Sequence, residues 1–165
     1  MKKRIFLLLI ILCCLLSTTL AEEKSQILDR ANLLNQEEIA YLQQRIQSFQ
    51  KNVQMDFVLL TGDQIHEETA TEIADSTYEK GGYGLGDENS GVIYYIDMAE
   101  RYHYLSTAGR AISYMTDKRI ECAISLSSTY LTDGEYAKAV ECMINAIELY
   151  VREGIPFIDY YSDIE

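Results

Sequence analysis

The chain has 165 residues, with 26 acidic and 14 basic side chains and a formal net charge of −12 at pH 7. This acidity excludes nucleic acid as a partner, because such binding depends on Lys and Arg side chains that neutralise phosphates. It also disfavours anionic membrane surfaces. The length fits a single domain with a substantial core.

The first 21 residues have the pattern of a secretory signal peptide. Three basic residues at positions 2–4 precede an apolar run from Ile5 to Leu16, and residues 19–21 form a small-residue cleavage site. The apolar run is shorter than the ~20 residues that a membrane-spanning helix needs. The sequence therefore predicts export to an extracytoplasmic location, secreted or in the cell envelope, and a mature chain from Glu22. A retained N-terminal anchor is the alternative.

Periodicity predicts the first elements in chain order. Residues 35–49 form a helix, because Asn35 and Glu38 make a capping box and apolar residues follow at helical spacing. Residues 53–60 are apolar on both faces, which is typical of a strand inside a sheet. Residues 70–78 form a second helix that two glycines close.

The second half of the chain adds two strands and two helices. Strands at 92–96 and 102–107 are joined by a turn short enough for a hairpin, so they should run antiparallel. A third helix begins at Thr116 and Asp117, and a fourth covers residues 136–151. The strand–helix–strand order predicts that the first two strands run parallel.

Together these elements predict an α/β fold. Three strands form a small mixed sheet with helices on both faces, which is a three-layer α/β/α sandwich. The domain is expected to span residues 22–153, followed by an acidic C-terminal tail at 154–165.

The glycine-rich loop at residues 84–91, with the sequence Gly-Leu-Gly-Asp-Glu-Asn-Ser-Gly, is the main candidate site. The predicted topology places this loop and the end of the last strand at one edge of the sheet, opposite the edge where Thr61 and Asp97 finish. Asp117, at a helix start, should join them there. The residues expected to meet are Asp87, Asn89 and Asp117 as metal ligands, and Gly84, Gly86, Thr107 and Gly109 in a substrate or ligand loop.

These segments resemble the TPM domain family. The similarity runs through Asp29-x-Ala31-x-Leu33-Leu34, residues 82–87, residues 91–93, residues 100–101, residues 106–109, residues 116–117 and residues 133–136, and it covers roughly residues 26–151. The resemblance implies an α/β sandwich in an extracytoplasmic or membrane-facing place. It also implies calcium binding in some members, acid-phosphatase activity in a few, and roles in protein quality control or in modulating membrane complexes.

Calcium is the cofactor that the loop favours. Asp87-x-Asn89-x-Gly91 is similar to the start of a calcium loop, but Met98 stands where an EF-hand needs a bidentate Glu. A calcium site must therefore recruit Asp29, Asp117 or backbone carbonyls, and a solvated loop is the alternative. Nucleotide binding is excluded, because the glycines precede a strand where phosphate-binding glycines precede a helix.

The cysteines and histidines suggest structural roles. Cys122 and Cys142 lie at similar distances from the turn between the last two helices, and an oxidising compartment would favour a disulfide. Two free thiols are the alternative. His66 and His103 are too few for a zinc–histidine cluster, and His103 is expected to be structural.

Three functions are consistent with this sequence. The preferred one is a calcium-binding, non-catalytic interaction or quality-control module that contacts an envelope or membrane protein. The alternative is a metal-dependent, acid phosphatase-like phosphomonoester hydrolase. The third is a structural partner protein that uses its acidic, tyrosine-rich surface. Binding is preferred over catalysis because no nucleophile or general base is evident beside the predicted metal ligands.

Overall fold

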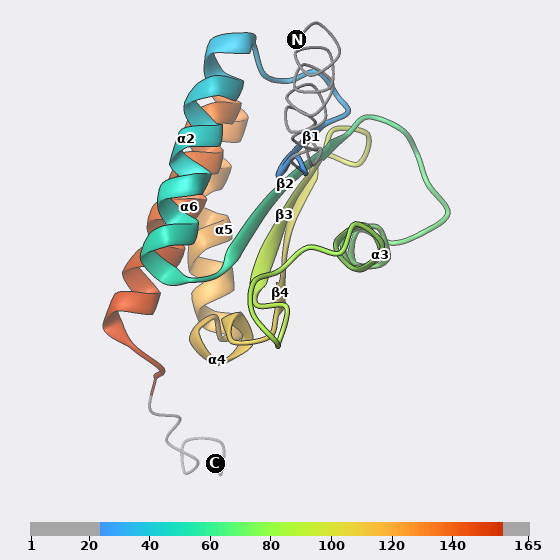
Figure 1. Ribbon diagram of the computed structural model, residues 1–165. Coiled ribbons are helices and arrows are strands. Elements are labelled where there is room, and N and C mark those ends of the chain that lie inside the picture. Colours follow the sequence, from blue (N-terminus) through green and yellow to red (C-terminus); the bar gives the residue numbers. More distant parts are fainter. Residues whose placement is uncertain (1–23, 157–165) are drawn as a thin grey trace, which may run out of the picture.

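The computed structural model describes residues 24–156. A four-stranded mixed sheet, in the order β1-β2-β3-β4, lies between two layers of helices (Figure 1). The strands are β1 (Ile27–Asp29), β2 (Asp56–Gly62), β3 (Gly91–Asp97) and β4 (Tyr102–Ala108). The first three run parallel and β4 pairs antiparallel with β3. The predicted α/β fold, the parallel crossover and the hairpin are confirmed.

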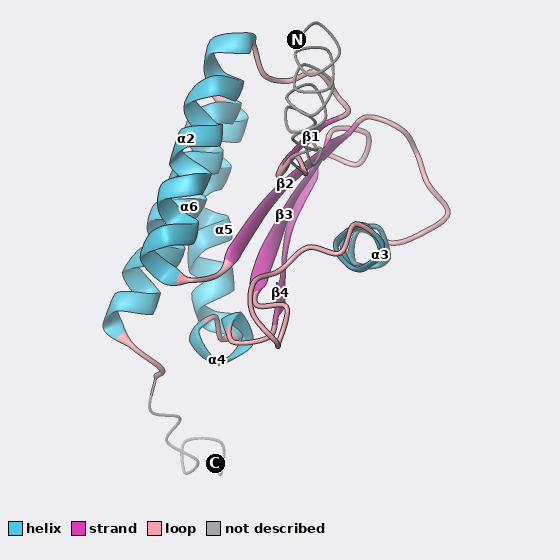
Figure 2. Ribbon diagram, viewed as in Figure 1, coloured by secondary structure: helices cyan, strands magenta, loops and turns pink. Residues whose placement is uncertain are grey.

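The helices are divided unequally between the two faces. One face is covered by α2 (Gln36–Val53), α5 (Asp117–Thr132) and α6 (Tyr136–Glu153), and the other by α3 (Ala70–Lys80) (Figure 2). The short helix α4 (Ala111–Tyr114) follows β4 at the end of the sheet. Within residues 24–156, no helix combines the length and apolarity that crossing a membrane requires.

The central strands are buried on both sides, as their apolar sequences predict. In β2, Phe57 and Leu59 pack into the core beneath α2 and α6, whereas Val58 and Leu60 pack beneath α3. All four side chains are at most 1% exposed. The alternation of a strand thus supplies two separate cores, one on each face of the sheet.

Three details differ from the sequence-based prediction. The strand β1 was not predicted, because three residues give too short a pattern to detect. Helix α2 continues through Val53, which lies buried on its apolar face, and β2 begins only at Asp56 after Gln54 turns the chain with a φ of 56°. The helix α4 was also not predicted. The expected signal peptide at 1–21 and most of the expected acidic tail lie outside the described residues.

Candidate functional site

The sheet has two ends that differ in how they are built. We call the end where β3 begins and β4 finishes the loop end, and the end where β2 and β3 finish the carboxyl end. Gly62 pairs with Asp97 at the carboxyl end, and Gly91 pairs with Ala108 at the loop end. The prediction that Thr61 and Asp97 finish opposite the glycine loop is therefore confirmed.

At the loop end, residues 84–90 form a closed loop held by backbone hydrogen bonds. Leu85 and Ser90 exchange two bonds, with N···O distances of 3.0 and 2.8 Å. The Gly84 amide donates to the Asp56 carboxylate at 3.0 Å, and the Tyr78 hydroxyl donates to the Asn89 carbonyl at 3.2 Å. The loop is therefore anchored both to the start of β2 and to α3.

Two glycines allow the loop and the end of β4 to approach each other. Gly84 has a φ of +106°, and a Cβ there would lie 2.2 Å from the Asn89 carbonyl oxygen. Gly109 has a φ of +57°, and a Cβ there would lie 2.5 Å from the Glu88 carbonyl oxygen. Any side chain at either position would collide with backbone that cannot easily move. The next amide, of Arg110, donates to Ser90 Oγ at 3.0 Å.

The other residues predicted to meet the glycine loop also lie at the loop end, but not all of them contact one another. Asp87, Asn89 and Gly86 are exposed on the loop, and Asn89 has a left-handed φ of 48°. Thr107, two residues before Gly109, pairs with Val92 of β3. Asp117 begins α5 at the same end and is exposed, but in the described residues no hydrogen bond or ion pair joins it to the loop.

Asp29 lies at the opposite end of the sheet. It pairs with Thr61 in the last position of β1, and the seven residues of β2 separate the two ends by roughly 20 Å. Its carboxylate accepts hydrogen bonds from the Leu33 and Leu34 amides at 3.0 and 2.9 Å and from Thr61 Oγ1 at 2.6 Å. One ion cannot therefore be held by Asp29 together with Asp87, Asn89 and Asp117.

No group of three or more His, Cys, Asp or Glu side chains within residues 24–156 is placed to hold a metal ion. A calcium ion at the loop end would therefore be bound by Asp87 and Asn89 together with backbone carbonyls and water. These are ligands that Ca²⁺ accepts, but they give few charges to the site.

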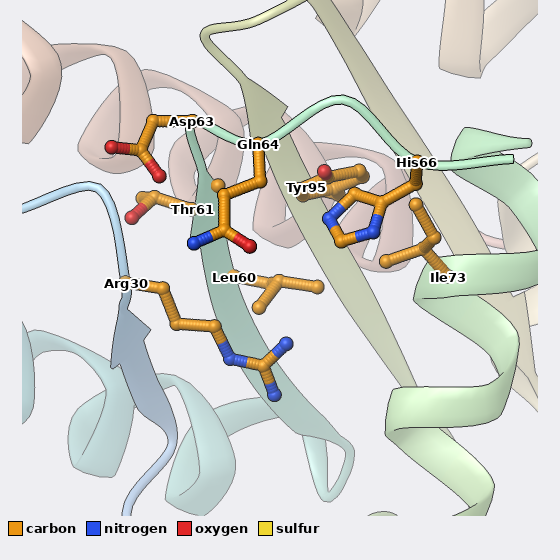
Figure 3. A pocket seen from close by; sticks show the side chains of 9 residues that line it. Arg30, Leu60, Thr61, Asp63, Gln64, His66, Ile73 and Tyr95 are labelled. Carbon is orange, nitrogen blue, oxygen red and sulfur yellow. The ribbon is translucent and has the colours of Figure 1, made fainter. Parts of the chain in front are cut away.

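The carboxyl end contains a small pocket of about 130 Å³ that the sequence did not predict. Arg30, Gln64 and His66 extend over it from two loops, and Thr61 and Tyr95 come from the strands beneath (Figure 3). This is the edge of a parallel sheet where α/β proteins commonly bind ligands. The sequence signal for this pocket was Thr61, at the end of the strand predicted over residues 53–60, but the prediction treated Thr61 only as the boundary of that strand.

Tyr95 is a buried residue of this pocket with a polar group, its hydroxyl. Burial raises the pKa of its hydroxyl to about 12, and the nearby Asp97 carboxylate adds to the increase. The hydroxyl therefore stays protonated and acts as a hydrogen-bond donor near neutral pH. A Cβ on Gly62 would lie 2.9 Å from that hydroxyl oxygen, so the absence of a side chain at Gly62 leaves room for Tyr95.

The predicted disulfide is not formed, and both Cys122 and Cys142 are free. Cys122 instead lies near Tyr150 of α6, whose pKa is raised mainly by burial and also by the Cys122 thiol. Tyr150 is eight residues beyond Cys142 on α6, which is about 12 Å along a helix. Because α5 ends at Thr132 and α6 begins at Tyr136, Cys122 lies ten residues before the turn and Cys142 only six residues after it, so the two cysteines are not at the same height.

Comparisons with solved structures support the fold. The N-terminal domain of a protein from P. gingivalis aligns with a TM-score of 0.69 and 17% identity, over 82% of this chain and 87% of that one. The N-terminal domain of the cg2496 protein from Corynebacterium glutamicum aligns with a TM-score of 0.62 and 13% identity, over 81% and 84%. The BA42 protein from the psychrophilic bacterium Bizionia argentinensis aligns with a TM-score of 0.64 and 12% identity, over 76% and 86%.

Sequence comparison gives the family directly. No curated protein matches the chain. The family model for the TPM domain, in contrast, matches residues 27–150, which includes all four strands and all but the last three residues of α6. This match agrees with the loop, strand and helix motifs by which the sequence resembled that family. The chain therefore belongs to the TPM domain family.

Proposed function

We propose that this protein is an exported interaction module that binds Ca²⁺ at the loop end of its sheet, without catalysis at that end, and contacts an envelope or membrane protein. The observation that carries the proposal is the fixed loop at residues 84–90. Two glycines and four hydrogen bonds hold its backbone, while the side chains of Asp87, Glu88 and Asn89 remain at the surface.

The side chains of this loop are free to take a ligand. Asp87 and Glu88 are exposed, and within the described residues neither carboxylate accepts a hydrogen bond or forms an ion pair. Ca²⁺ takes six to eight oxygen ligands, and sites with few protein charges in extracellular modules bind with dissociation constants of about 10⁻⁴–10⁻³ M. We expect an affinity in that range, which suits the calcium concentrations outside cells.

Binding is favoured over phosphoester hydrolysis by the chemistry near the loop. A hydrolase would need a nucleophile or general base beside the metal. Ser90, the serine of the loop, is 2% exposed, and its Oγ accepts a hydrogen bond from the Arg110 amide, so this hydroxyl is engaged in holding the backbone. Arg110 is the nearby cation, and its guanidinium lies 5.9 Å from the ring centroid of Tyr114.

The test is a calcium titration followed by thermal melting, with Mg²⁺ at equal ionic strength as the control. At ten times the dissociation constant, a bound ion should stabilise the fold by about 1.4 kcal/mol. The stabilisation should disappear in Asp87→Ala and persist in Asp133→Ala, an exposed aspartate in the turn between α5 and α6. No calcium-specific shift would contradict the proposal.

The same variants separate the phosphatase alternative. Hydrolysis of p-nitrophenyl phosphate that needs added metal and is lost in Asp87→Ala would favour catalysis at the loop end.

Export is tested separately, by sequencing the N-terminus of the protein recovered outside the cytoplasm. A start at Glu22 is expected, and a start at Met1 would favour the retained anchor.

A further inference from the structure

A second cavity lies at the carboxyl end, on the face of the sheet that α5 and α6 cover. Its volume is about 560 Å³, within the range typical of small-molecule sites. It lies between the β3–β4 hairpin and the facing parts of α5 and α6. Ile96, Met98, Leu131 and Tyr136 give it apolar walls, and His103 and Ser128 contribute polar atoms.

A continuous chain of hydrogen bonds leads from this cleft into the core. Ser128 Oγ lies 2.9 Å from His103 Nε2, and His103 Nδ1 lies 2.8 Å from the Tyr94 hydroxyl. The Tyr94 hydroxyl donates to Ser127 Oγ at 3.2 Å, and Ser127 Oγ donates to the Ile124 carbonyl at 3.0 Å. Tyr94 and Ser127 are both 0% exposed, so the inner part of the chain is fixed by packing.

The directions of these bonds assign the proton on His103. Because Ser127 uses its only proton on the Ile124 carbonyl, its oxygen must accept the proton of Tyr94. The Tyr94 oxygen then accepts from His103 Nδ1–H. The lone pair of Nε2 is therefore directed to Ser128, which is the arrangement that a general base needs.

The environment also keeps His103 neutral. Burial lowers the pKa of its imidazole, so the base form predominates at neutral pH. The Ser128 hydroxyl has a second acceptor 2.9 Å away, the Ile124 carbonyl, and its one proton can point to either. A backbone carbonyl one turn back on α5 thus holds Ser128 Oγ in place without removing it from the cleft.

We propose that this cleft is a second functional site, where His103 acts as general base and Ser128 as nucleophile toward small neutral carboxylic esters. Ser128 Oγ forms a bond to the carbonyl carbon while its proton passes to His103 Nε2. The ester C–O bond then breaks, and the alcohol leaves with that proton. Water, activated by the same imidazole, attacks the acyl group, releases the acid and restores Ser128.

The lining of the cleft indicates the class of substrate. Asp97 is among the residues that line the cleft, and its carboxylate accepts hydrogen bonds from the Ala99 and Glu100 amides at 2.9 and 3.2 Å, which places a negative charge at this end of the sheet. Anionic substrates such as phosphomonoesters are disfavoured there. Of the described residues that line the cleft, Arg101 alone carries a positive charge, which can stabilise the developing oxyanion. The apolar walls suit a short acyl chain.

The experiment labels the purified protein with a fluorophosphonate, which transfers its phosphorus to an activated serine oxygen and releases fluoride. Mass spectrometry of the labelled peptides should place the adduct on Ser128. An absent adduct, or one on another residue, would overturn the proposal, and this result needs no variant.

Variants measure the role of each group. Ser128→Ala and His103→Gln should each reduce the labelling rate and p-nitrophenyl acetate hydrolysis by at least about 100-fold, as removal of a nucleophile or base does. Ser125→Ala, an exposed serine one turn earlier on α5, should leave both unchanged. Equal hydrolysis by the Ser128→Ala and unaltered proteins would also overturn the proposal. Asp87→Ala should retain the labelling, which separates this site from the proposed calcium site.

Discussion

The two ends of the sheet are held by different kinds of contact. At the loop end, backbone packs on backbone: Gly84 and Gly109 let main-chain atoms approach more closely than any Cβ would permit. At the carboxyl end, side chains do the positioning, with Asp29 accepting three hydrogen bonds and Tyr95 buried beneath the pocket. The first kind of contact requires a particular residue type, glycine, whereas the second can be made by many residue types.

This difference predicts unequal sensitivity to substitution. The largest effect is expected for Gly84→Ala, because the new Cβ would meet the Asn89 carbonyl and the φ of +106° is strained for any other residue. We expect a loss of about 3 kcal/mol or more in the free energy of unfolding. Denaturation in urea measures it. Gly86→Ala is the matched control, because Gly86 has a φ of +72° but no atom within 4 Å of the added Cβ.

Gly86→Ala should cost only about 1 kcal/mol, the backbone penalty alone. The difference between the two variants isolates the close approach of the loop to itself. Equal losses would show that φ strain, and not packing of backbone on backbone, accounts for both glycines.

At the carboxyl end, Asp29→Ala is expected to cost about 2 kcal/mol, because the Leu33 and Leu34 amides and the Thr61 hydroxyl all lose an acceptor. Asp29→Asn keeps one acceptor oxygen and should cost less. Asp63→Ala, at an exposed position beside the same pocket, should change the free energy of unfolding by less than about 0.5 kcal/mol. A loss as large in Asp63→Ala would contradict a specific role for Asp29.

A smaller effect is expected where the loop end does use a side chain. Ser90→Ala removes the acceptor of the Arg110 amide from a position that is 2% exposed, and should cost about 1 kcal/mol. Ser113→Ala, on the exposed side of the neighbouring helix α4, serves as the control in the same denaturation experiment. A loss near that of Gly84→Ala would mean that side chains hold this end as firmly as backbone does.

Sequence patterns predicted the loop end better than the carboxyl end for the same physical reason. Glycines at 84 and 109 are visible in the sequence, and the order of strands was enough to bring them together. The capping box predicted at Asn35 likewise acts within a few residues of chain, and the structure contains it. Local chemistry of this kind can be read directly.

Contacts between side chains that are distant in sequence could not be predicted from such local patterns. Nothing near His103 in the chain indicates that Ser128 and Tyr94, from a helix and a neighbouring strand, would bond its two ring nitrogens. Cys122 and Cys142 are equally distant from Thr132, but the turn occupies residues 133–135, so Tyr150 and not Cys142 lies near Cys122. Such contacts depend on the packing of helices on the sheet, which periodicity alone does not determine.

The smallest expected effect is a pH dependence from the carboxyl end. Burial lowers the pKa of His103 below its ordinary value of 6.5, and the groups around the ring are Tyr94, Ser127 and Ser128, with Asp97 and Arg101 also lining the cleft. Above pH 6.5 the imidazole is neutral in the folded and unfolded chains alike. As the pH falls below 6.5, the imidazole becomes protonated in the unfolded chain but stays neutral in the folded chain, so the free energy of unfolding decreases. The decrease ends when the pH is below the pKa of His103 in the folded chain.

Urea denaturation between about pH 5 and 8 measures this slope, in the range where histidine is the side chain expected to titrate. The slope should be smaller in His103→Gln, which keeps a hydrogen-bonding side chain but cannot titrate. His66→Gln, at an exposed position of the pocket on the other face, should retain it. If His66→Gln reduced the slope and His103→Gln did not, the pH dependence would come from the small pocket and not from the buried hydrogen-bond chain. The assignment of His103 as a neutral base would then lose its support.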